Sequence, residues 1–99
     1  MNITINSVHF KADIKLEEFI QKKVEKLSQY SDDIVEATVF LRLENTSDKE
    51  NKISEIKIDY PRAVDLFAKK QCSTFEEGID LAVNALKVKL VKTKQKIRG

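Results

Sequence analysis

Residues 34–44 read IVEATVFLRLE, and apolar side chains recur at every second position along most of this stretch. One side of the pattern carries Val35, Ala37, Val39, Leu41 and Leu43, and the other carries Thr38, Phe40 and Arg42. Successive side chains of a β-strand point to opposite faces of its sheet. The pattern therefore predicts a strand with one buried face and one face open to water.

Two more strands are expected downstream, after the polar loop ENTSDKENK (44–52). The segment SEIKIDY (54–60) places three apolar side chains on one face: Ile56, Ile58 and Tyr60. The turn YPRA (60–63) holds the only proline. The segment VDLFAKK (64–70) then directs Val64, Leu66 and Ala68 inward and Phe67 outward. Short connections between these strands predict an antiparallel meander.

A strand and a helix are expected upstream. NITIN (2–6) alternates like a half-buried strand, and DIKLEEFIQKKVEKL (13–27) has helical periodicity. Asp13 is suited to cap the helix N-terminus. The predicted buried stripe of this helix is Leu16, Phe19, Ile20, Val24 and Leu27.

A second helix closes the chain. Thr74 and Glu77 in TFEE (74–77) form a capping-box pattern. The apolar face that follows consists of Phe75, Ile79, Ala82, Val83, Leu86 and Leu90. The helix is expected to reach about residue 96, which makes it about 33 Å long.

The predicted element order is βαβββα, an α+β fold. A right-handed crossover joins the first two strands, and both helices cover one face of a four-stranded sheet. The order αβββα after the first strand is that of a double-stranded-RNA-binding domain. We expect residues 1–99 to form a single domain, since 99 residues supply one modest core.

The residue inventory gives little support for catalysis. His9 is the only histidine and Cys72 the only cysteine, and a Cys–His nucleophile needs both within hydrogen-bond reach plus a third, orienting group. One His and one Cys do not suggest a zinc site, and no glycine-rich phosphate loop is present. We therefore expect no enzyme activity, cofactor, metal or small-molecule substrate. No apolar run approaches 18 residues, so we expect a soluble cytoplasmic protein without a membrane partner.

Charge is concentrated in KVKLVKTKQKIRG (87–99), which holds six basic residues and no acid. The first 86 residues carry 12 basic and 16 acidic side chains, a net charge of −4. One or two lysines would suffice to complement a helix dipole. At 100° per residue the six bases form two opposite rows, one with Lys87, Lys94 and Arg98 and one with Lys89, Lys92 and Lys96. Two cationic rows on a rod suit nucleic-acid phosphates.

Two further features extend this prediction. Lys22, Lys23 and Lys26 lie off the apolar stripe of the first helix, and they form either a solvated face or a patch shared with the last helix. Phe40 and Phe67 are expected on the open sheet face. They are suited either to stack on bases or to stabilise the sheet as a cross-strand pair.

The two helices resemble those of the ribosome hibernation promoting factors and ribosome-associated inhibitor A. In FIQKKVEKLSQY (19–30) the matching residues are Lys23, Lys26, Leu27 and Tyr30. In the segment 75–97 they are Ile79, Asp80, Leu86, Leu90, Lys92, Lys94 and Lys96. Val88 and Ala85 depart from the family, which often has Arg and Lys there.

The resemblance implies a stress or stationary-phase factor that binds small-subunit ribosomal RNA between head and body. It would block the messenger RNA and transfer RNA sites by occupancy. With no dimerisation domain after Gly99, the chain resembles the short form, and we expect a monomer off the ribosome. Two alternatives are a regulator that docks a protein on the open sheet face and a generic double-stranded RNA binder.

Overall fold

The structure, a computed structural model, describes the backbone of residues 1–61 and 63–98 and the side chains of residues 1–61 and 66–93. Its elements are β1 (Asn2–Val8), α1 (Ile14–Glu25), the 3₁₀ helix η1 (Lys26–Gln29), β2 (Glu36–Leu43), β3 (Lys52–Tyr60), β4 (Ala63–Cys72) and α2 (Phe75–Arg98). The predicted βαβββα order is confirmed.

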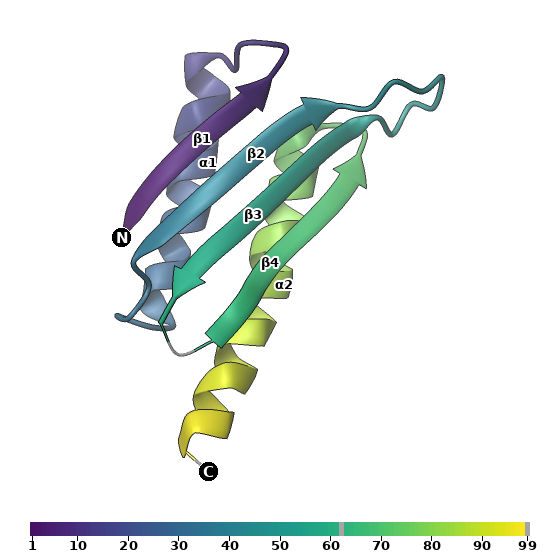
Figure 1. The fold of residues 1–99 in the computed structure, drawn as a ribbon. Helices are drawn as coiled ribbons and strands as arrows, with labels where there is room; N and C mark the ends of the chain where they lie inside the picture. Colours follow the sequence, from purple (N-terminus) through teal and green to yellow (C-terminus); the bar gives the residue numbers. More distant parts are fainter. Residues whose placement is uncertain (62, 99) are drawn as a thin grey trace.

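The strands form one mixed sheet in the order β1-β2-β3-β4 (Figure 1). β1 pairs in parallel with β2, whereas β2–β3 and β3–β4 pair antiparallel. Both helices lie behind the same face of the sheet, so the predicted two-layer architecture is confirmed. α1 and α2 also run in the same direction and finish toward the same end of the molecule (Figure 1).

The core lies between the sheet and the helices and is built from the predicted apolar faces. The helices contribute the fully buried Ile20, Val24, Leu27, Ile79, Ala82 and Leu86. The strands contribute Ala37, Val39, Leu41, Ile56, Ile58, Tyr60, Leu66 and Ala68, all less than a tenth exposed. Burying these side chains is the main source of stability, at roughly 25 cal/mol per Å² of apolar surface.

Both predicted helix caps are present. The Leu16 N–H donates to Asp13 Oδ1 at 2.8 Å, and the Glu77 N–H donates to Thr74 Oγ1 at 3.1 Å. Each cap satisfies one of the backbone donors that a helix N-terminus leaves unpaired. The return bond of the Thr74 capping box stays a prediction.

The alternating apolar side chains are not buried at the two ends of the predicted strand. Val35 is 50% exposed and Leu43 51% exposed. Val35 precedes the strand and Leu43 ends it, and alternation fixes the face of a sheet without fixing how far the helices cover that face. In the predicted turn, Tyr60 pairs with Ala63, while Arg62 and the Val64 side chain lie outside the described residues.

The molecule is elongated, with principal extents of 47 × 24 × 17 Å. Figure 1 shows the cause: the C-terminal part of α2, drawn in yellow, continues past the end of the sheet. Leu90 is only 1% exposed, whereas Val91 and Lys92 are exposed. Leu90 is the last buried side chain among those of α2 that the structure describes.

Candidate nucleic-acid interface

The predicted basic residues lie in the last turn of α1, in η1 and in the second half of α2. Lys22 and Lys23 are in the last turn of α1, and Lys26 opens η1. Because α1 and α2 run in the same direction, the basic second half of α2 follows at the same end (Figure 1). The first turns at the other end are acidic, with Glu17 in α1 and Glu76 and Glu77 in α2. The molecule is therefore electrically polar along its helices.

A salt bridge joins the two helices. Lys23 Nζ lies 3.1 Å from Asp80 Oδ1, with the two side chains 34% and 47% exposed. The same ammonium lies 5.6 Å from the centroid of the Phe19 ring. The flanks of α1 and α2 are thus neighbours, as the sequence suggested, but the charge of Lys23 is partly neutralised. At this exposure the pair contributes little to stability, about 0.2–1 kcal/mol.

Lys87 lies on the same flank of α2 as Asp80. The line along which α1 and η1 contact this flank is called the seam here. Its Nζ lies 5.3 Å from the centroid of Tyr30, which directly follows η1. Seven residues separate Asp80 from Lys87, which places them within about 20° of each other around α2. A cation–π contact holds the ammonium in place without removing its charge. Lys87 therefore remains available to an anion.

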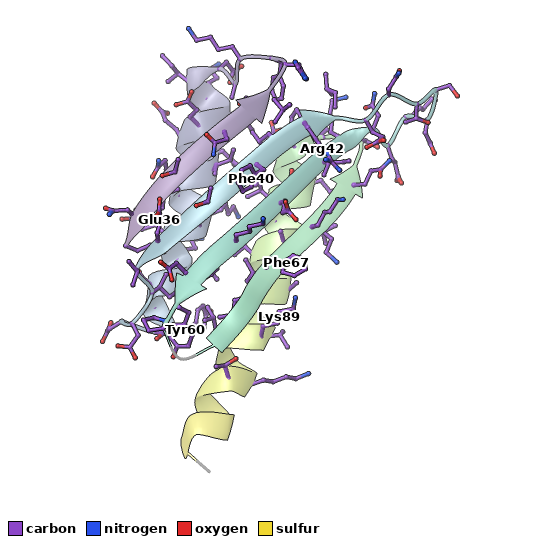
Figure 2. All side chains as sticks on the ribbon, in the orientation of Figure 1. Glu36, Phe40, Arg42, Tyr60, Phe67 and Lys89 are labelled. Atoms are coloured by element: carbon purple, nitrogen blue, oxygen red, sulfur yellow. The ribbon has the colours of Figure 1, made fainter. Side chains whose placement is uncertain are left out.

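Lys89 lies on the opposite side of α2. Its Nζ donates to the Phe67 carbonyl oxygen at 2.5 Å and lies 5.3 Å from the Phe67 ring centroid. β4 is an edge strand, so this lysine caps a carbonyl on the free edge of the sheet. Figure 2 shows Phe67 and Lys89 together at this edge. The contact gives Lys89 a structural role that the sequence did not predict.

The remaining predicted cations differ in how far the structure describes them. Lys22, Lys26 and Lys92 are exposed. The side chains of Lys94, Lys96 and Arg98 lie outside the described residues, although their backbone forms the last turns of α2. The name helix surface is used below for the basic residues where α1 and η1 contact α2 and for those at the end of α2: Lys22, Lys23, Lys26, Lys87, Lys92, Lys94, Lys96 and Arg98. This surface carries basic residues in series, an arrangement suited to phosphates.

The described residues give no support for a Cys72–His9 nucleophile. His9 follows β1 and Cys72 ends β4, and these strands lie at opposite edges of the sheet, although the segments after them meet where the Phe10 and Phe75 rings stack with centroids 5.1 Å apart. Cys72 is buried, and this burial, followed by the charges of Glu77 and Glu50, raises the pKa of its thiol. Among the described residues, no group of three or more His, Cys, Asp or Glu is placed to hold a metal ion.

Tyr30 and Asp80 were singled out in the sequence only as residues that match the family. Their contacts with Lys87 and Lys23 were not predicted, because no local pattern shows pairing between distant helices. Arg42, Lys57 and Lys69 form a second set of cations on the open sheet face. Their place in the period-two alternation, opposite the core residues, would have been the signal.

No helix among residues 1–61 and 63–98 is long and apolar enough to cross a membrane. The amphipathic pattern of α2 is used instead for packing on the sheet.

Comparisons with known proteins agree with this architecture. Residues 3–98 match the family model described as sigma 54 modulation protein / S30EA ribosomal protein. The N-terminal domain of Thermus thermophilus Protein Y is similar in structure, with a TM-score of 0.78, 22% identity, and coverage of 93% of this chain and 98% of that one. A ribosomal subunit interface protein from Coxiella burnetii also has a TM-score of 0.78, with 20% identity and coverage of 96% and 99%. The comparison with curated proteins found no significant match.

Proposed function

The chain belongs to the sigma 54 modulation protein / S30EA ribosomal protein family, and we propose that it is a ribosome hibernation factor that inhibits translation by occupancy. The family resemblance drawn from the two helices is thereby confirmed. The proposed partner is the small subunit, and the proposed place is its decoding channel, where messenger RNA and transfer RNAs would otherwise lie. The whole chain would act as one ribosome-binding domain in the cytoplasm during stationary phase or stress.

The observation that carries the proposal is the single cationic surface formed by two distant segments. The Lys23–Asp80 and Lys87–Tyr30 contacts place the end of α1 and η1 beside α2 between residues 80 and 87, where the basic segment of α2 begins. The similar Coxiella burnetii protein is named a ribosomal subunit interface protein, which agrees with an interface role. The extended shape of 47 × 24 × 17 Å suits a channel better than a flat surface.

The proposed mechanism makes and breaks no covalent bond. Ammonium groups of the helix surface neutralise RNA phosphates and release condensed counterions. Phosphate contacts position a protein without reading sequence, so selectivity must come from the shape of the RNA. Inhibition then follows because the protein and the translation substrates cannot occupy the same space.

Ribosome pelleting of the triple variant Lys92→Gln, Lys94→Gln, Lys96→Gln tests the proposal. We expect ribosome association to be lost, with circular dichroism unchanged, because all three side chains follow Leu90, the last buried one among the side chains of α2 that the structure describes. A matched control replaces the exposed Lys11, Lys15 and Lys49 by Gln, which changes the net charge equally outside the helix surface. Equal pelleting of the two triple variants would reject the helix surface as the main contact.

A further inference from the structure

The open face of the sheet carries an alternating series of aromatic rings and lysines. Lys57 Nζ on β3 lies 5.4 Å from the ring centroid of Phe40 on β2. The cross-strand partner of Lys57 on β4 is Phe67, whose ring in turn lies under Lys89 of α2. The series Phe40–Lys57–Phe67–Lys89, called the sheet ladder here, crosses three strands and ends on the basic helix (Figure 2).

The two phenylalanines do not stabilise the sheet as a cross-strand pair. The directly opposite residues are Asn6 and Glu55 for Phe40, and Lys57 for Phe67. Phe67 is 42% exposed, and it lines a shallow hollow together with Lys57 and Glu55. A direct Phe40–Phe67 pair is therefore excluded, because β3 lies between β2 and β4.

A second hollow adjoins the first and shares Glu55 with it. Phe40, Arg42 and Lys69 line it above Ile53, which is only 3% exposed although it lies on the open face. The two hollows thus combine two aromatic rings, an apolar floor and three cations with one carboxylate. Lys89 adds a fourth cation at the β4 edge.

We propose that the sheet ladder binds single-stranded RNA, with bases stacked on Phe40 and Phe67 and phosphates near Arg42, Lys57, Lys69 and Lys89. Every base has a stacking face, and aromatic rings interleaved with cations are the usual platform for single strands. Within the two hollows and at the β4 edge four cations face one carboxylate, which favours this polyanion over a protein partner, whereas Glu36 and Asp59 lie farther along the same face. Lys89 joins the ladder to α2, so a strand leaving the helix surface would pass over the β4 edge onto the open face.

The inference goes beyond ribosome binding and is tested without ribosomes. Fluorescence anisotropy would measure the affinity of the full chain for a labelled oligouridylate of about ten nucleotides. We expect Phe67→Ala and Phe40→Ala each to weaken binding at least about fivefold. Phe→Leu variants at the same positions keep the apolar area and lose the stacking face, so we expect them to bind as weakly as the Ala variants. Circular dichroism establishes that each variant is folded.

An abasic oligonucleotide of the same length separates stacking from charge. We expect the original protein to bind the abasic oligonucleotide as weakly as the Phe variants bind the oligouridylate. The Phe variants should bind the abasic oligonucleotide with the same affinity as the original protein does. Affinity that the Leu variants restore would overturn the proposal and favour docking of an apolar partner. Binding that is equal for all ring variants, or equal for a duplex of the same length, would overturn it as well. Ribosome pelleting of the same variants shows whether the helix surface acts independently.

Discussion

At Gly78, α2 and β3 approach each other too closely to leave room for a side chain. A Cβ atom at position 78 would lie 2.8 Å from Ser54 Oγ and 3.1 Å from Ser54 Cβ. Ser54 is fully buried, and its hydroxyl donates to the Phe75 carbonyl at 3.3 Å. Any shift of Ser54 therefore disturbs both the core and the start of α2.

Gly78→Ala should lower the free energy of unfolding by about 1–2 kcal/mol. Overpacking costs about 1–3 kcal/mol, and the better helix propensity of Ala returns up to about 1 kcal/mol. Urea unfolding followed by circular dichroism measures the change. In the Ser54→Ala background the cost of the added methyl should shrink, because the closest atom is gone. A Gly78→Ala protein as stable as the original would contradict the close approach.

Cys72 is a buried thiol whose ionisation the fold opposes. Burial, then Glu77 and Glu50, raises its pKa above the ordinary value of 9.0. A raised pKa means that the folded state holds the proton more tightly than the unfolded state. The resulting stabilisation is fully present below the ordinary value and is lost as the pH rises through the folded-state value.

We therefore expect the stability of the original protein to fall more steeply above about pH 9 than that of Cys72→Ala. Urea midpoints measured from neutral to alkaline pH give both curves. The other titrating groups are common to the two proteins, so the difference isolates the thiol. Parallel curves would show that burial does not affect the ionisation of Cys72.

At the scale of elements, the sequence predicted which face of a strand is buried better than it predicted where the strand and its burial end. Alternation placed Ala37, Val39 and Leu41 correctly because each lies within β2 where the helices cover the sheet. The same reasoning failed at Val35 and Leu43, since coverage depends on the path of helices elsewhere in the chain. β3 begins at Lys52 and not at Ser54, because backbone pairing with β2 does not require apolar side chains.

For the candidate site, the sequence predicted which lysines are exposed but not which residues they contact. Lys22, Lys26 and Lys92 are exposed, as their positions off the apolar stripes indicated. The partners of Lys23 and Lys89 were not predictable, because each contact joins residues more than 20 positions apart. A single sequence reports local periodicity and gives no information on which side chains meet across elements.

Lys89 and Lys92 offer a matched pair within α2. Lys89 donates to the edge of β4, whereas Lys92 has no ion-pair or ring partner among the described side chains. Lys89→Met should lower the free energy of unfolding by about 0.5–1 kcal/mol, and Lys92→Met should leave it unchanged. Urea unfolding measures both. Equal stabilities would show that the β4 edge does not depend on Lys89.

The whole molecule separates its charges along the helix direction. Acids occupy the first turns of both helices, and lysines occupy the last turns, so each helix dipole is complemented at both ends. The same arrangement gathers the cations where α2 extends past the sheet, with few neighbouring acids. A separation of charge that stabilises the helices thus also produces the surface proposed to bind RNA.

This polarity predicts a steep dependence of ribosome binding on salt. If about six lysine–phosphate contacts form, each contributes roughly −0.7 to −0.9 to the slope of log affinity against log salt concentration. Affinity should then fall by about three decades between roughly 50 and 200 mM monovalent salt at fixed magnesium. Filter retention at several salt concentrations gives the slope. The Lys11, Lys15, Lys49→Gln control should leave the slope nearly unchanged, whereas the Lys92, Lys94, Lys96→Gln variant should show no measurable retention over this range. A slope shallower than about −2 would mean that at most three phosphates are neutralised, and the basic end of α2 would then be an ordinary solvated helix terminus.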